Sequence, residues 1–298
     1  MRLPNASLNT ELIARLQQLA GRQAGLQNQV STGQRITQPG DDPFAAGQVV
    51  AAQLEQSELG QAGRNANAAL FASQNTAAAL GQLKTLSGRA GEIAMLASGT
   101  LGGESLGSYA VELNQLLEQA VAVGNSAVDG GHLFAGTATS TAPFAVTRDS
   151  AGKITAVAYV GGSAATTVPV GGGVSLPTST NGATNAALAA FMGQISALRD
   201  GLAAGDTAAI QSSVAPLDSA DDAIVNTIGD QAAIQSRIEA VQAQQQARLT
   251  ALGQQITEAS AADLPSTIVK LTQANQAYEA ALSSAAKLMN TSLLDYLR

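Results

Sequence analysis

The feature that most constrains the fold is a pair of hydrophobic stripes at helical spacing, one near each end of the 298-residue chain. The N-terminal stripe consists of Leu12, Leu16, Leu19, Gln23, Leu26 and Val30. The C-terminal stripe consists of Ile268, Leu271, Asn275, Tyr278, Leu282, Ala285, Met289, Ser292 and Tyr296. Residues three and four apart share one face of a helix, close to the coiled-coil repeat. Because a narrow apolar face is stable only when another helix covers it, we expect the two ends to pair, within one chain or between copies.

Long helices are predicted over most of the chain, at about residues 7–32, 43–98, 104–128, 186–204, 207–256 and from 263 onward. Asp42 and Pro43 form a good helix start, since the carboxylate accepts free N–H groups and proline suits the first helical position. The second helix contains five glycines, which we interpret first as sites of close helix packing and second as breaks. They are Gly60, Gly63, Gly81, Gly88 and Gly91.

A change of composition between about residues 137 and 185 predicts a β insert. Thr, Val, Gly and Pro dominate there, and residues 143–162 predict two strands around the turn Asp149–Gly152. The segments TTVPV and VSL predict further short strands. The predicted fold class is therefore mainly α: long antiparallel helices form a coiled-coil-like rod, with a small β domain inserted mid-chain.

The predicted domains follow from this order of elements. Residues 1–42 and 258–298 are the terminal assembly helices, and residues 43–140 and 186–257 are a helical rod domain. Residues 141–185 are the inserted β domain. Aromatic residues make up only 3% of the chain, which favours thin helical layers over one thick core.

Composition and motifs argue against an enzyme. The net charge is −7, with no basic run that would bind nucleic acid, and cysteine is absent. His132 is the sole histidine and has no ligand cluster around it, so we predict no catalytic, metal or cofactor site. Asp218, Asp221 and Asp222 share a helix face, which we interpret as solvated or paired with arginine.

The sequence also predicts a soluble chain without membrane insertion. Its longest uninterrupted apolar run, residues 186–192, is far shorter than the roughly 20 residues that span a bilayer. The N-terminus lacks the apolar segment of a Sec signal peptide. We therefore expect that export, if it occurs, uses another route.

Several short segments, in order, resemble the flagellin family. Residues 31–36, followed by 40–43, are similar to the family's N-terminal spoke region, and residues 63–68, leading through 74–76 to Leu80, continue the likeness. Pro39-Gly40 departs from the family pattern. Residues 131–137 and 143–144, and the tail 292–297, are more similar to the family's hook–filament junction subunit than to its bulk filament subunit.

The resemblance implies an extracellular structural subunit of the bacterial flagellum, exported by the type III apparatus without a cleaved signal peptide. The implied partners are copies of the chain in a ring, flagellin, the hook-side hook-associated protein and a type III export chaperone. Terminal helices of different copies would form an inner tube, and the β insert would be an outward knob. The alternative is flagellin itself, the bulk filament subunit.

The candidate site is an assembly interface. It comprises Leu12, Leu16, Leu19, Leu26, Val30, Ile268, Leu271, Tyr278, Leu282, Met289 and Tyr296. We expect Leu12, Leu19 and Leu26 to pack against Leu271, Tyr278 and Leu282, between copies or within one chain. In the loop of residues 33–42, called the spoke loop below, Arg35 and Asp42 would pair; alternatively Arg35 is exposed and Asp42 only caps a helix. The polar stripe residues Gln23, Gln245 and Asn275 have two possible roles. They either fix the register of the paired helices or lie at the solvent-exposed margin of the helix interface.

Overall fold

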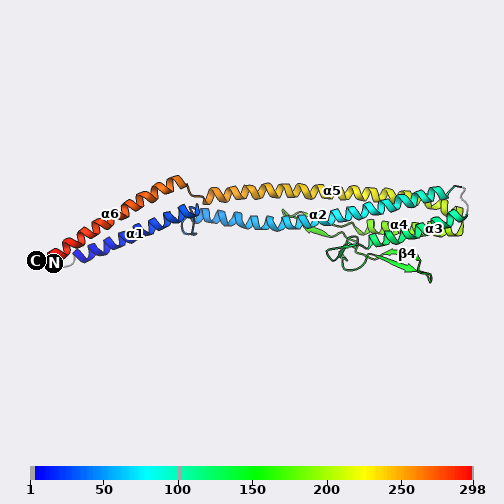
Figure 1. Ribbon diagram of the computed structural model, residues 1–298, viewed down its shortest axis with the longest axis horizontal. Helices are drawn as coiled ribbons and strands as arrows, with labels where there is room; N and C mark the ends of the chain where they lie inside the picture. Colours follow the sequence, from blue (N-terminus) through cyan, green and yellow to red (C-terminus); the bar gives the residue numbers. More distant parts are fainter. Residues whose placement is uncertain (1–3, 100–102, 297–298) are drawn as a thin grey trace. The chain divides into compact units, whose positions relative to one another are not determined.

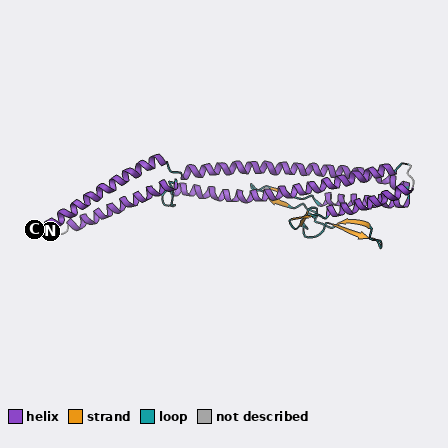
Figure 2. Ribbon diagram, in the orientation of Figure 1, coloured by secondary structure: helices purple, strands orange, loops and turns teal. Residues whose placement is uncertain are grey.

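A computed structural model describes residues 4–99 and 103–296, with side chains for residues 10–99 and 103–287. Helices form most of the described chain (Figure 1): α1 (Pro4–Thr32), α2 (Pro43–Ala97), α3 (Gly103–Gly124), α4 (Gly182–Ala204), α5 (Thr207–Ser260) and α6 (Leu264–Tyr296). Short strands lie between α3 and α4 (Figure 2): β1 (Ala127–Val128), β2 (Gly131–His132), β3 (Phe144–Arg148), β4 (Ile154–Tyr159), β5 (Thr167–Pro169) and β6 (Ser175–Pro177). The predicted fold class, mainly α with a small β region mid-chain, is confirmed.

The chain forms two compact units. The first unit contains Met1–Ser57 and Arg248–Arg298, and the second contains Glu58–Ala247. The long helices α2 and α5 therefore contribute residues to both. The domain boundaries predicted at residues 42/43 and 257/258 separate assembly helices from a rod. The two units are defined only by their internal contacts, so these boundaries stay a prediction.

Helix α2 runs without interruption through its glycines. Its start is as predicted, because Asp42 Oδ1 accepts a hydrogen bond from Ala45 N at 3.1 Å. A Cβ added at Gly81, Gly88 or Gly91 would meet no atom within 4 Å, so the prediction of close helix packing at these glycines is wrong. The helix persists because its opposite face is buried in the core.

Helix α3 ends at Gly124, a few residues before the predicted end. The strands β1 and β2 follow and pair antiparallel, with Val128 opposite Gly131. The two residues between them, Asp129 and Gly130, have φ values of 52° and 80°. Two-residue hairpin turns of type I′ need positive φ at both positions, and Asp-Gly is a preferred sequence for them. The sequence thus contains the signal for this hairpin, which the helix prediction missed.

Helix α4 begins at Gly182, earlier than predicted, because Asn181 caps it. Asn181 has extended backbone angles, and its side chain accepts a hydrogen bond from Thr184 N at 2.9 Å. The helix ends at Gly205, which has the left-handed φ of 67° expected of a C-terminal glycine.

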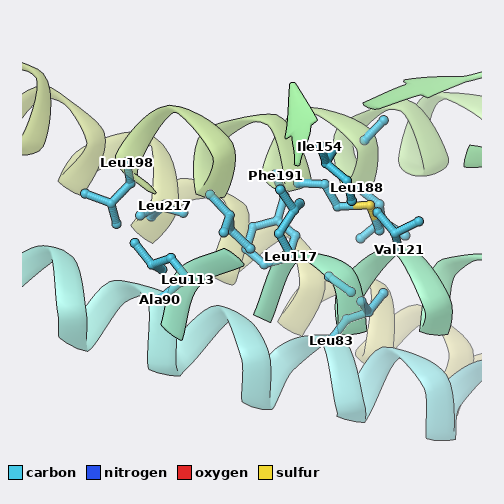
Figure 3. Close-up of a cluster of buried hydrophobic side chains, with 14 of the residues drawn as sticks. Leu83, Ala90, Leu113, Leu117, Val121, Ile154, Leu188, Phe191, Leu198 and Leu217 are labelled. Carbon is cyan, nitrogen blue, oxygen red and sulfur yellow. The ribbon is translucent and has the colours of Figure 1, made fainter. Parts of the chain in front are cut away.

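The main core lies in the second unit and joins four helices to the β insert (Figure 3). Its labelled members are Leu83 and Ala90 of α2, Leu113, Leu117 and Val121 of α3, Ile154 of β4, Leu188, Phe191 and Leu198 of α4, and Leu217 of α5. Ile154 belongs to the predicted β3–β4 hairpin, whose register pairs Phe144 with Tyr159. The hairpin is thus fixed to the helices by burial of its own apolar residues.

Candidate assembly surface

The terminal helices α1 and α6 lie side by side within one chain (Figure 1). All α1 residues of the predicted stripe are half-buried: Leu12, Leu16, Leu19, Gln23, Leu26 and Val30. None of them is fully buried, so the single partner helix leaves each one partly open to solvent. The intrachain pairing is the alternative that the sequence left open.

Helix α6 buries a face that is rotated from its predicted stripe. Thr267, Ala274 and Ala285 are buried, and Leu271 and Tyr278 are half-buried. In contrast, Ile268 is 49% exposed and Leu282 is 44% exposed. Met289 and Tyr296 lie outside the described side chains.

An apolar edge therefore remains along the terminal pair. It comprises Leu264, Ile268, Val269 and Leu282 of α6, all exposed, and Ile13 of α1 is exposed as well. Leu264, Ile268 and Leu282 fall on one line of the helix surface, given about 100° per residue. Leu264 and Ile268 are one helical turn apart, and Leu282 lies further along the same line.

A second exposed apolar face lies at the start of α2 and was missed in the sequence. Phe44 is 78% exposed, and Val50 and Leu54 are also exposed. Gly47 and Ala51 occupy the same face of the helix. Residues 44–54 include no charged residue, so this face is uncharged. The three- and four-residue spacing of these positions is the signal in the sequence that could have indicated this face.

The spoke loop is organised by Arg35. Its Nη1 donates to Asp42 Oδ2 at 3.0 Å, and its Nη2 donates to Ala259 O at 3.0 Å. Asp42 uses its other carboxylate oxygen to cap α2 through Ala45 N. The two alternatives for Asp42, pairing and capping, are therefore both realised in the structure.

Two carboxylates in the spoke loop are stabilised in their charged form. The pKa of Asp42 lies below its ordinary value, mainly because Ala45 N–H donates to it and secondly because Arg35 does. The pKa of Asp41 is also lowered, because Thr37 N–H and Gln38 N–H both donate to Oδ2. Both carboxylates thus hold the loop most firmly when they are ionised.

Backbone hydrogen bonds join the spoke loop to the turn between α5 and α6. Arg35 N donates to Ser260 O at 2.7 Å, and Ala262 N donates to Gly33 O at 2.8 Å. A hollow of about 200 Å³ lies beside this joint, lined by Ile36, Pro39, Val50 and Ile256 among others. The joint therefore lies at the end of α1 and just before the start of α6.

The polar residues of the stripes have distinct environments. Gln245 is buried and donates from Nε2 to Val170 O of the β insert at 2.5 Å. It therefore binds the insert, which neither of the two predicted roles anticipated. Asn275 has a buried Oδ1 with no partner among the described residues, and Gln23 is half-buried.

The histidine and one of the aspartates that were considered as possible catalytic or metal-binding residues make structural contacts instead. His132 Nδ1 lies 2.8 Å from Asn125 O. Asp221 pairs with Lys84 Nζ at 2.7 Å, so its partner is a lysine. Within the described residues, no group of three metal-ligating side chains comes together and no helix is apolar enough over its length to cross a membrane.

Comparison with known sequences shows what the first part of the chain is similar to. Residues 5–139 match the sequence model of the bacterial flagellin N-terminal helical region. The predicted resemblance to the flagellin family is thus confirmed over this part, which includes α1, α2 and α3.

Two curated relatives that match part of this chain are both named flagellar hook-associated protein 3. Flagellar hook-associated protein 3 of Salmonella typhimurium is 36% identical over 124 residues, which are 40% of this chain and 38% of the relative. That of Escherichia coli K12 is 35% identical over 140 residues, which are 45% of this chain and 41% of the relative. The chain thus matches about two fifths of the length of these relatives.

Solved structures share the fold. A flagellar hook-associated protein from Vibrio parahaemolyticus superposes with a TM-score of 0.64 at 17% identity, covering 74% of this chain and 100% of that one. FlgL of Bacillus cereus gives a TM-score of 0.59 at 20% identity, covering 70% and 99%. The curated relatives are structural flagellar proteins and not enzymes, in agreement with the prediction that this chain is not an enzyme.

Proposed function

We propose that this chain is a structural subunit of the bacterial flagellum that joins the hook region to the filament. The observation that supports the proposal best is the apolar edge of α6, where Ile268 and Leu282 stay exposed after α1 and α6 have paired. An edge of this kind is suited to packing against the terminal helices of other copies. The likeness to hook-associated protein 3 supplies the biological setting.

In this proposal the chain works outside the cell, in a ring of copies between the hook-side hook-associated protein and the first flagellin subunits. It would be exported unfolded by the type III apparatus with the help of a chaperone. The spoke loop would set the direction in which both terminal helices leave the longer helices, because it is bonded to the α5–α6 turn.

The test replaces one exposed apolar residue of the edge by a charge. Leu282→Asp should leave the helicity of the purified chain unchanged, because the side chain is already exposed within the monomer. The variant should fail to be incorporated into flagella and to restore motility to cells lacking the gene. Val225→Asp is the matched control, since Val225 is 45% exposed on α5 in the second unit. Normal incorporation of the Leu282→Asp protein would contradict the proposal.

Flagellin remains the second candidate function, because the matching family description is that of the flagellin N-terminal helical region. Self-polymerisation separates the two. Purified flagellin-type subunits should extend into long filaments when seeded, whereas a junction subunit should not.

A further inference from the structure

The β5–β6 hairpin of the insert lies on the helices α2 and α5. Its strands pair antiparallel, with Thr167 opposite Pro177 and Pro169 opposite Ser175. The tip contains three consecutive glycines, residues 171–173, all with positive φ. Side chains rarely adopt such angles, so the tight tip depends on glycine.

Two polar side chains hold the tip, one from each helix. Asn65 Nδ2 of α2 donates to Pro169 O at 2.9 Å, and Gln245 Nε2 of α5 donates to Val170 O at 2.5 Å. We call Asn65 and Gln245 the latch. Gly171 lies so close to α2 that an added Cβ would be 3.1 Å from Ala62 Cβ. The tip thus approaches the helices closely through its backbone.

Apolar burial under the tip is small. The buried cluster consists of Val170 and Leu176 from the hairpin, Ala66 and Ala69 from α2, and Ile238 from α5. Four partly buried apolar residues pack against it: Leu70, Val168, Ile234 and Val241. This cluster is separate from the main core and has far fewer members. Because stabilisation scales with the apolar area removed from water, we expect it to stabilise its surroundings less than the main core does.

The base of the hairpin is firmly anchored. Asn185 is fully buried and binds Thr180 Oγ1, Phe134 O and Tyr159 Oη through its side chain. Gly182 packs against Ser163 so closely that a Cβ would lie 2.6 Å from Ser163 Cα. The chain entering and leaving the hairpin is therefore fixed at this end.

Two hollows lie beside the base of the hairpin, one on each side. A hollow of about 190 Å³ separates it from α2 and the β1–β2 hairpin, and one of about 320 Å³ separates it from α5. Ser179 lines both hollows. In the larger one, Gln231 is only 2% exposed, and its Nε2 has no partner among the described residues. Close packing against the helices is thus confined to the part of the hairpin nearer its tip, where Val170 and Leu176 are buried.

We propose that residues 166–178 form a strap, hinged at its anchored base and latched at its tip, that opens and closes over α2 and α5 without unfolding of the helices. When closed, the strap links α2 to α5, because the two latch residues come from different helices. When open, it leaves the helices connected by their own contacts, including the bond from Gln242 Nε2 to Asn67 Oδ1. The strap goes beyond the flagellar role and does not depend on it.

Hydrogen exchange on the full chain tests the strap. A two-stranded hairpin is marginally stable by itself in water, so the hydrogen bonds within the strap should break once it leaves the helices. In the wild type, the amides of Val170, Val174 and Thr178, which are bonded within the strap, should therefore exchange faster than α2 amides near Ala66. Gln245→Ala removes one latch bond and should speed exchange of the strap amides by about fivefold or more. Amides of α2 and α5 should keep their rates.

Gln242→Ala is the matched control, because it removes a bond between the same two helices without touching the strap. It should leave strap exchange unchanged. Asn65→Ala is a second latch variant and should repeat the effect of Gln245→Ala. The proposal is overturned if strap and α2 amides exchange together in the wild type, or if neither latch variant changes strap exchange.

Discussion

Two asparagines at the start of α4, four residues apart, predict very different effects of mutation to alanine. Asn185 is 0% exposed, whereas Asn181 is an exposed cap. In Asn185→Ala, two buried groups lose their partner: Phe134 O, bonded at 2.7 Å, and Thr180 Oγ1, bonded at 2.5 Å. Tyr159 Oη is not stranded, because it still donates to Gly162 O at 2.7 Å.

The magnitude follows from these two orphaned groups. Each buried polar group left without a partner costs about 1–3 kcal/mol, so Asn185→Ala should lower the free energy of unfolding by about 4 kcal/mol. Asn181→Ala removes one cap bond and should cost about 1 kcal/mol. Urea denaturation followed by far-UV circular dichroism measures both. The reasoning is refuted if Asn185→Ala costs no more than Asn181→Ala.

Three further predictions follow from the structure. Leu117→Ala, at a fully buried position of α3, should destabilise the chain by about 2–5 kcal/mol, whereas Val111→Ala, 62% exposed on the same helix, should cost little; denaturation curves compare them. Glu112 and Glu118 have pKa values below the ordinary 4.5, because Arg89 and Arg148 donate to them. Their contribution to stability is therefore present above about pH 5 and is lost as the pH falls through their folded-state pKa, so Glu118→Gln should flatten the acid limb of a stability–pH curve. Arg35→Ala should speed hydrogen exchange at Ala262 N, which is bonded to the spoke loop, and equal exchange rates would contradict the role given to Arg35.

Much of the fold could be predicted because its helices carry local signals. Asp42 and Pro43 mark the start of α2, and the turn Asp149–Gly152 marks the β3–β4 hairpin. The end of α3 was misplaced because apolar periodicity continues past Gly124 and outweighed the Asp129-Gly130 turn signal. The early start of α4 was missed because Asn181 lies in a loop rich in Thr and Ser.

The residues of the candidate assembly surface were harder to predict, because which side of α6 stays exposed depends on its contacts with α1. The large residues Ile268 and Leu282 were expected on the same face as Leu271, but one partner helix covers only part of a stripe. Helix α6 buries Thr267 and Ala274, which lie outside the predicted stripe, while Ile268 and Leu282 stay exposed. Gln245 lies on an apolar stripe at helical spacing, and nothing local indicates that a hairpin from residues 167–177 reaches it. The assembly role of the stripes stays a prediction.

The most direct test of the proposed function is the position of the protein on intact flagella. An epitope inserted at the exposed β3–β4 turn, residues 150–152, can be labelled with gold and located by electron microscopy. The proposal predicts a single band of label between hook and filament. Label along the whole filament, or no label on any flagellum, would contradict it.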